Sequence, residues 1–311
     1  MGEMPEVPSS EHAIRVSGPK RRRERGILRL LWADRKASVG MVLFAIFVLL
    51  AIFGPALAPY NPNDISFVPS QPPSFQHWLG TTGNGQDVFS QLLWGTRGSV
   101  LVGLIAGCLG TCVAILVGML PAFKGGAVDL IASTFTNIIL VLPGLPLLII
   151  VASYLQKSGT VTIAIIIGLT GWAWGARVLR SQTLTLAQRD FVIAAKLSGS
   201  SDLRVLFTEI LPNMVSLVIA HLMFTCLAAV LAEAGLQFLG IAQVTTVTWG
   251  SMLYWAESGE ALLNGDWWWL IPPGLAIALL GGSFALMNFG VDQIANPRLR
   301  TAMPRKWSRQ R

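Results

Sequence analysis

Residue types that commonly perform catalysis or bind metals are few in this chain and lie far apart. The three histidines, His12, His77 and His221, show no metal-ligand spacing. The sequence contains no G-x-S-x-G elbow, and no pair of carboxylates lies beside a candidate base. It also lacks the phosphate loop G-x-x-x-x-G-K-[ST], so the chain cannot hydrolyse ATP by that mechanism. We expect a protein without catalytic residues, without a metal site and without a cofactor of its own.

His221 and Glu233 are the two ionisable residues within a long apolar segment, 213–239. A charge at membrane depth is costly, so such residues usually face a bundle interior, a cavity or a partner. They are twelve residues apart, which is about three and a third helical turns and places them on different helix faces. Each is a candidate either for a buried hydrogen-bonding role or for contact with a substrate on a translocation path.

The cysteines, Cys108, Cys112 and Cys226, all fall inside apolar runs. Cys108 and Cys112 are four residues apart and share a helix face. This spacing suits small packing residues better than a disulfide or a metal site.

The segments that carry these residues are apolar and long enough to cross a membrane. The chain of 311 residues is 53% hydrophobic and 13% charged, whereas a soluble domain carries about 25% charged residues. Long apolar runs alternate with short polar connections, which indicates an all-α membrane protein. Prolines 143 and 146 predict a kink in the third run, and prolines 272 and 273 lie near the start of the last. Six transmembrane helices are predicted, at 38–58, 99–123, 130–155, 160–176, 213–239 and 267–291.

The first apolar run has a second interpretation, as a cleaved secretion signal. Basic residues precede it, and Ala56-Leu57-Ala58 at its end fits an A-x-A cleavage site. However, more than thirty residues precede the run, and its length is sufficient for a membrane span. We therefore expect a retained transmembrane helix.

The positions of lysine and arginine predict the orientation of the bundle. Of the 23 basic residues, 21 fall in the N-terminal segment, in the connections after the second and fourth spans, or in the C-terminal tail; Arg97 and Lys157 are the exceptions. The positive-inside rule then places both termini in the cytoplasm. Because topology and anionic lipid contacts explain the basic residues, no binding to nucleic acid is expected.

Four regions follow from these assignments. Residues 1–37 form a basic cytoplasmic segment, 38–98 the first transmembrane helix with an outer loop, 99–292 the core domain, and 293–311 a cytoplasmic tail. The outer segment 59–98 is rich in loop formers and is expected to hold short helices at most. A second outer segment, 240–266, is acidic and precedes three tryptophans, 267–269, which favour the headgroup layer.

The longest cytoplasmic connection between spans, 181–213, contains helix formers on both sides of a glycine. Phe191, Ala194, Ala195 and Ser198 lie on one face at helical spacing. Gly199 then ends this helix, because glycine adopts left-handed backbone angles at low cost.

The second half of this connection predicts another short helix. Ser200, Ser201 and Asp202 are N-cap candidates, and Pro212 marks the return to the membrane. The apolar side chains expected on one side of this helix are Leu203, Leu206, Phe207 and Ile210. Such a helix pair is too polar to insert, yet it presents apolar side chains at a cytoplasmic surface. It fits a groove on a partner protein, and a helix lying on the lipid surface is the alternative.

This connection resembles the coupling loop of bacterial binding-protein-dependent ABC import permeases. That family has two alanines, a glycine and a closing Leu-Pro pair, matched here by Ala194, Ala195, Gly199, Leu211 and Pro212. The family normally has glutamate before the alanines, where this chain has isoleucine at position 193. The resemblance implies that the loop inserts into a cleft of an ATPase subunit. The ATPase-docking residues it implies are Phe191, Ala194, Ala195, Lys196, Ser198, Gly199, Ser200, Asp202, Leu203, Leu211 and Pro212.

Further motifs resemble the oligopeptide and dipeptide branch of that family. The outer-loop signature includes His77, Trp78, Gly80 and Asp87, although the branch usually has Asp and Arg at positions 82 and 86. The other matching segments are 232–236, 238–240, 249–250, 252–253, 267–269 and 296–300. The chain is similar to the second, C-type, permease subunit of a peptide importer.

The resemblance implies a type I ABC importer permease fold in the bacterial inner membrane, with both termini cytoplasmic. It implies four kinds of partner: a second related permease, two ABC ATPase subunits that hold ATP and Mg, an extracytoplasmic substrate-binding protein and the bilayer. Di- or oligopeptides are the expected cargo; nickel, haem or another small solute is the alternative. An ATP-independent carrier, a passive channel and a membrane-embedded enzyme are the rival classes.

Overall fold

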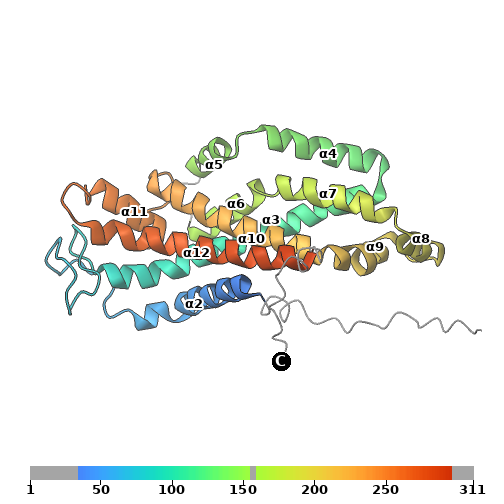
Figure 1. Cartoon of the computed structure of the whole chain (residues 1–311). Helices are drawn as coiled ribbons and strands as arrows, with labels where there is room; N and C mark the ends of the chain where they lie inside the picture. Colours follow the sequence, from blue (N-terminus) through green and yellow to red (C-terminus); the bar gives the residue numbers. More distant parts are fainter. Residues whose placement is uncertain (1–33, 155–158, 296–311) are drawn as a thin grey trace, which may run out of the picture.

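The computed structural model describes residues 34–154 and 159–295, so the N-terminal segment and the C-terminal tail expected from the sequence lie largely outside it. Every element within these residues is helical, apart from an isolated antiparallel bridge between Thr81 and Asp87. The helices run along one long axis, with an irregular segment at one end and two short helices at the other (Figure 1). The predicted all-helical class is confirmed.

Four helices among the described residues are long and apolar enough to cross a membrane alone. α2 (Arg35–Leu57) begins after Asp34, whose carboxylate accepts hydrogen bonds from two backbone N–H groups. α3 (Val88–Lys124) begins in the same way after Asp87, and such caps satisfy N–H groups that have no partner within the helix. α10 (Leu211–Phe238) and α12 (Trp267–Ala295) complete the set.

Two further helix pairs are broken near their middle. α4 (Gly126–Val141) and α5 (Gly144–Ser153) meet at 86°. The residue before a proline avoids helical angles, and Leu142, which precedes Pro143, is accordingly extended. α6 (Thr160–Thr170) and α7 (Ala173–Ala187) meet at 43°. Counting each pair as one span gives up to six spans in the described residues.

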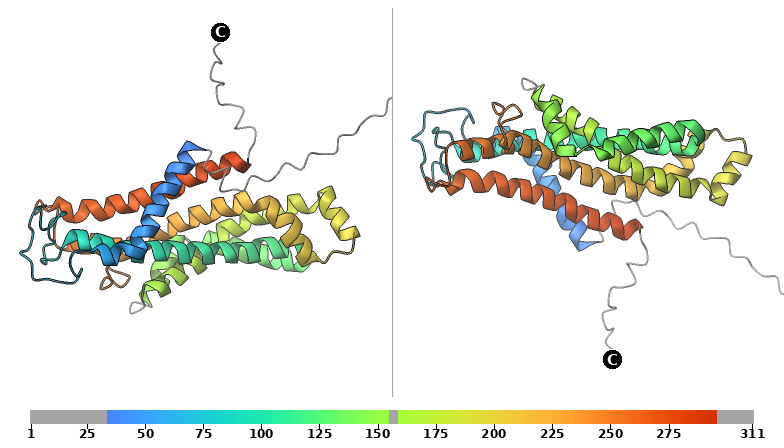
Figure 2. Two further views of the ribbon diagram at one scale, coloured as in Figure 1. Left: turned by 90° about the horizontal axis from the view of Figure 1, so that it is seen from below. Right: turned by 90° about the horizontal axis from the view of Figure 1, so that it is seen from above.

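Glycines let the long helices approach closely. A Cβ atom at Gly103 or Gly107 of α3 would collide with Val230 or Cys226 of α10. A Cβ atom at Gly40 of α2 would lie 2.7 Å from a backbone oxygen of α12, and both views of Figure 2 show α2 crossing the bundle at an angle. Such contacts stabilise membrane bundles, because burial from lipid provides little hydrophobic driving force.

The structure corrects two predicted boundaries. α3 begins at Val88, eleven residues before the predicted start at 99, so 59–98 is not a loop throughout. Polar residues in this first part lower its hydropathy, but they serve the fold: the Gln91 amide donates to the Pro62 carbonyl at 3.1 Å. α7 continues to Ala187, so the connection predicted at 181–213 does not begin at Ser181.

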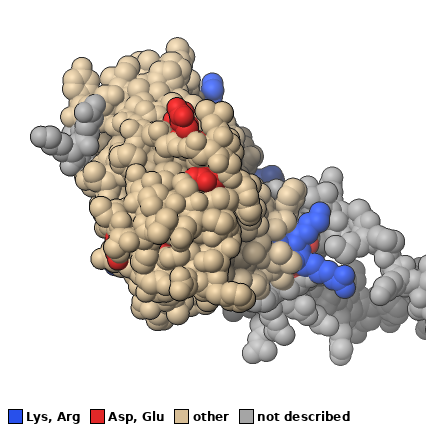
Figure 3. Space-filling model, turned by 90° about the vertical axis from the view of Figure 1, so that its left-hand side faces the viewer, with Lys and Arg blue, Asp and Glu red and all other residues tan. Residues whose placement is uncertain are grey.

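The end of the bundle that the sequence predicts to face outward, called the outer end below, combines segment 58–87 with α11 (Trp249–Ser258). α11 starts with a capping box, in which the Thr248 and Ser251 side chains each accept from the other's backbone N–H. Figure 3 shows this end face on, with isolated acidic side chains on a mostly uncharged surface.

Candidate functional site

The end of the molecule opposite α11 is a tip formed by two helices, α8 (Asp190–Leu197) and α9 (Asp202–Val205). It projects beyond the ends of α2 and α12 (Figure 1). Gly199 lies between the two helices with φ +81°, and its N–H donates to the Lys196 carbonyl at 3.0 Å. A glycine in this conformation ends a helix and reverses the chain, which agrees with the helix–glycine–helix pattern of the sequence.

The second tip helix is not the separate short helix expected from the sequence. α9 continues through a π-helical turn, Leu206–Ile210, into α10, so one helix runs over Asp202–Phe238. The Leu211 N–H donates to the Leu206 carbonyl, five residues back. This wider turn accommodates Pro212, which has no N–H to donate. Pro212 therefore does not separate the tip from the membrane helix.

The faces of the tip also differ from the prediction. Leu206 and Ile210 are buried against the bundle together with Val192 and Val205, whereas Leu203 and Phe207 are exposed. The expected apolar side of the second helix is therefore divided between the core and the surface. The exposed large apolar side chains of the tip are Phe191, Ile193, Leu197, Leu203 and Phe207.

Leu197 is the most exposed of these side chains, at 84%. Sequence reasoning did not select it, although its position directly before the glycine break places it at the turn of the tip. Of the predicted docking residues, Ala194, Ser198, Gly199 and Pro212 are exposed. Ala195, Ser200 and Leu211 are half-buried, so they support the tip rather than form its outer face.

Lys196 links α8 to the bundle, and its contact with Asp202 links α8 to α9. The Lys196 ammonium lies 4.1 Å from the centre of the Phe123 ring at the end of α3, which is a cation–π contact. The same ammonium is 3.9 Å from a carboxylate oxygen of Asp202. Nearby, Arg180 of α7 donates two hydrogen bonds of 2.7 Å to Asp129 of α4, a bidentate geometry that fixes both helices. The apolar face is thus presented on an ordered support.

The outer-loop signature has a structural role at the start of α3. His77 Nδ1 lies 2.8 Å from Asp87 Oδ1, and both side chains are buried. The other carboxylate oxygen of Asp87 accepts from the Ser90 N–H and caps α3. Gly80 has φ +73°, which favours glycine. Trp78 is exposed and contacts only Phe89 among described rings, so it is the member of the signature available to a partner.

Glu233 lies in a fully buried polar junction near the outer end of α10. Its carboxyl group is beside the hydroxyl groups of Ser99 and Thr248, but neither reaches hydrogen-bond geometry. Thr248 donates to the Gln237 side chain, and the Trp249 N–H donates to Ser99 at 3.3 Å. Glu233 therefore faces the meeting point of α3, α10 and the start of α11.

His221 is on another part of α10, as the spacing predicted. It lines a hollow of about 270 Å³ together with residues from α5, α6 and α7. The His221 side chain is 6% exposed, and the Thr225 hydroxyl is 3.4 Å from its Nε2. The structure thus does not bring His221 and Glu233 together.

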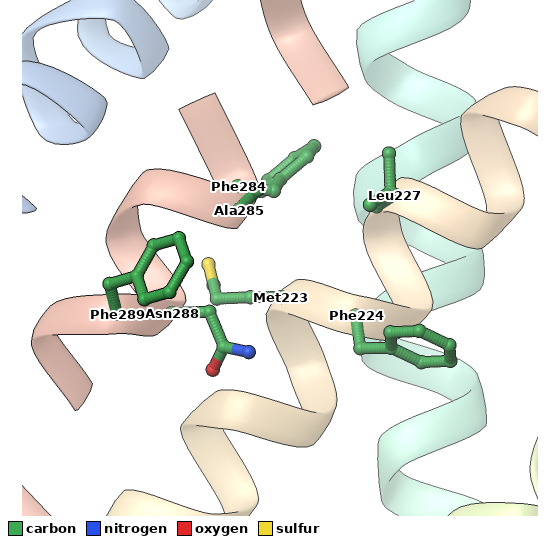
Figure 4. A pocket seen from close by; sticks show the side chains of 7 residues that line it. All are labelled: Met223, Phe224, Leu227, Phe284, Ala285, Asn288 and Phe289. Atoms are coloured by element: carbon green, nitrogen blue, oxygen red, sulfur yellow. The ribbon is translucent and has the colours of Figure 1, made fainter. Parts of the chain in front are cut away.

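A second hollow, of about 190 Å³, lies between α10 and α12 (Figure 4). Figure 4 shows Met223 and Leu227 from α10 with Phe284 and Asn288 from α12. Asn288 is the polar residue of this otherwise apolar lining, and its buried Oδ1 accepts no hydrogen bond in the described residues. A search for charged groups misses such a residue, because an amide within an apolar run changes the hydropathy little.

Two family descriptions match different parts of the chain. Residues 110–301 match the family described as binding-protein-dependent transport system inner membrane component. Residues 25–73 match the N-terminal transmembrane domain of oligopeptide transport permease C.

Individual relatives match across most of the chain. The dipeptide transport system permease protein of Bacillus subtilis is 33% identical, over 88% of this chain and 85% of the relative. The oligopeptide transport system permease protein of the same organism is 30% identical, over 86% of this chain and 87% of the relative. The corresponding oligopeptide permease of Mycobacterium tuberculosis is 30% identical, over 82% and 88% of the two chains.

Proposed function

This chain belongs to the family of binding-protein-dependent transport system inner membrane components, and we propose that it is a permease subunit of an ATP-driven peptide importer. It is a multi-pass membrane protein. The peptide cargo is supported by its relatives, which are named as dipeptide and oligopeptide permeases. The observation that carries the proposal is the tip, because an ordered support presents unpartnered apolar side chains outside the membrane helices.

The proposed topology has six spans, with both broken pairs crossing the membrane, and both termini in the cytoplasm. Among the described residues, Lys124, Arg189, Lys196 and Arg204 lie in the connections at the tip end. The positive-inside rule favours the cytoplasm for that end. The regions proposed are then a basic segment at 1–37, a first helix and outer loop at 38–98, the core permease domain at 99–292 and a tail at 293–311.

The proposed complex contains this permease, a second related permease, two ATPase subunits and a substrate-binding protein on the outer side. ATP and Mg bind the ATPase subunits, and this chain supplies no catalytic residue. The exposed tip is the docking surface for one ATPase subunit. The opposite end, with its exposed Trp78 and scattered acidic side chains, faces the binding protein.

Continuity between the tip and the membrane suggests how movement is transmitted. α9, the π-helical turn and α10 form one helix of 37 residues, Asp202–Phe238. A displacement of the tip therefore carries α10 with it, whereas Lys196 links the tip to α3. Closure of the ATPase pair would move the tip and rock α10 against α3, which is alternating access by rigid-body motion.

Reconstitution tests this function. The purified complex in proteoliposomes should accumulate labelled peptide only when ATP and the loaded binding protein are both present. Accumulation of nickel or haem but not of peptide would show that the cargo is nickel or haem. Peptide uptake without ATP would contradict the importer and support an ATP-independent carrier.

A further inference from the structure

A lateral groove on the bundle lies where both broken spans approach α10. Its volume is about 270 Å³. Its walls are the start of α5, the bend between α6 and α7, and the middle of α10. The residues that define it here are Gly144, Leu148, Gly171, Trp174, His221 and Ala228.

The backbone at the first break argues against lipid as the occupant of this groove. α4 ends with the Leu142 N–H donating to Ile139 at 3.2 Å, and α5 starts with the Leu147 N–H donating to Pro143 at 3.1 Å. Neither bond joins α4 to α5, and no backbone hydrogen bond crosses this break in the described residues. Irregular backbone at membrane depth is tolerated only inside protein or beside a water-filled cavity.

The position of His221 along α10 indicates how deep the groove lies in the predicted membrane span. His221 lies ten residues after Leu211, the first residue of α10, which corresponds to about 15 Å along the helix. It lies seventeen residues before Phe238, the last residue of α10. The groove is therefore well inside the predicted membrane span, where a polar side chain marks a cavity or a substrate path.

The hydrogen bonds of His221 leave one ring nitrogen unused. The Thr225 hydroxyl donates its proton to the His221 carbonyl at 2.8 Å, so its oxygen is free to accept from His221 Nε2–H at 3.4 Å. In that tautomer Nδ1 is an acceptor, and this buried atom has no partner. The ring packs directly on Gly175, where any Cβ atom would collide with it. The imidazole is thus held in place with an unfilled acceptor.

We infer that His221 accepts a hydrogen bond from an N–H group of the peptide as the peptide passes the lateral groove. This inference rests on the proposed function. A peptide carries an amide N–H at most of its residues, and leaving such a donor unpaired away from water is unfavourable. An acceptor that bonds only to a backbone N–H group can bind peptides whose side chains differ. The rest of the groove wall is largely apolar.

The first experiment compares His221→Leu with His221→Gln in the complete importer in proteoliposomes. The probe is a labelled peptide that the wild-type importer accumulates with ATP. The leucine variant should lose at least tenfold in uptake, while ATPase stimulation by loaded binding protein stays within twofold. The glutamine variant retains an acceptor and should stay within threefold of wild-type uptake. Normal uptake by the leucine variant, or equal loss of uptake and ATPase stimulation in both variants, would overturn the inference.

The second experiment tests whether water enters the groove. Cys108, Cys112 and Cys226 are replaced by alanine, and Ala228→Cys is compared with Leu49→Cys, an exposed position on α2. A charged methanethiosulfonate reagent should label position 228 at least tenfold faster than position 49. Equal, slow labelling would assign the groove to lipid and overturn the inference. If instead the wild-type complex accumulates no peptide, the proposed function itself fails, whatever the labelling shows.

Discussion

The two ends of this bundle differ in how their side chains are bonded within the chain. At the outer end, polar groups find partners within the chain: the Thr81 hydroxyl donates to Val68, the Trp268 indole to the Thr81 carbonyl, and His77 pairs with Asp87. Both ends expose large apolar side chains, such as Leu263 at the outer end and Leu197 at the tip, but no side-chain hydrogen bond joins α8 to α9 in the described residues. The outer end is thus ordered by buried polar contacts, whereas the tip depends on apolar packing and on the contacts of Lys196.

The largest effect is expected from Leu197→Asp at the tip. Burying an unpaired carboxylate in a docked interface costs about 3–5 kcal/mol, so ATPase subunits should no longer co-purify with the permease. The matched control is Leu263→Asp at the outer end, because Leu263 is 83% exposed and Leu197 is 84% exposed. Loss of the ATPase subunits in both variants, or in neither, would remove the distinction between the two ends.

Asp87→Ala should have the next largest effect, on stability rather than docking. It removes the cap of α3 and leaves buried His77 without its partner, a combined cost of about 2–3 kcal/mol. The midpoint of thermal unfolding, followed by circular dichroism, should fall. Asp64→Ala is the control, since the Asp64 carboxylate accepts hydrogen bonds only from Ser66 in the exposed loop. An equal effect of both substitutions would contradict the stabilising role of the Asp87 cap and of its contact with His77.

Gly199→Val should weaken coupling through the backbone alone. Position 199 has φ +81° and no atom within 4 Å of an added Cβ, so strain rather than a clash decides the outcome. Left-handed angles cost an L-residue about 1–2 kcal/mol. ATPase stimulation by loaded binding protein should fall roughly 5- to 30-fold. Gly199→Asn should stay close to wild type, because asparagine tolerates these angles; equal activity of both variants would contradict a required break.

The smallest effect is expected from Lys196→Met. It removes the contact with the Phe123 ring, worth about 0.5–1 kcal/mol at an exposed site. Hydrogen exchange of the α8 amides should become a few times faster. Arg204→Met removes a positive charge from α9 and should leave that exchange unchanged. Faster exchange in both variants would indicate a general charge effect instead of this contact.

Much of the fold could be predicted from apolar runs alone. Each predicted span overlaps a helix or a broken helix pair, and Pro143 marked the site of the sharpest bend. The start of α3 at Val88 could not be predicted by hydropathy, because polar residues such as Ser90, Gln91 and Arg97 interrupt its first turns, and Gln91 bonds to the outer loop. Their environment is set by tertiary contacts that no local pattern contains.

The sequence predicted the glycine break of the candidate site, but not which side chains are buried and which are exposed. The glycine break was visible in the sequence, because a helix end at Gly199 follows from local chemistry. The burial of Leu206 and Ile210 depends on where the bundle lies. The continuity of α9 with α10 was hidden by Pro212, since a proline usually begins a helix and here a π-helical turn accommodates it. Leu197 was missed because its exposure depends on the orientation of α8.

The most direct test of the tip as a docking surface is a photocrosslink from position 197. A benzoylphenylalanine residue replaces Leu197 in the assembled complex, and the same residue at position 263 is the control. We predict a crosslink from position 197 to an ATPase subunit and none from position 263. A product from position 197 that contains only lipid would contradict docking and place the tip on the membrane surface.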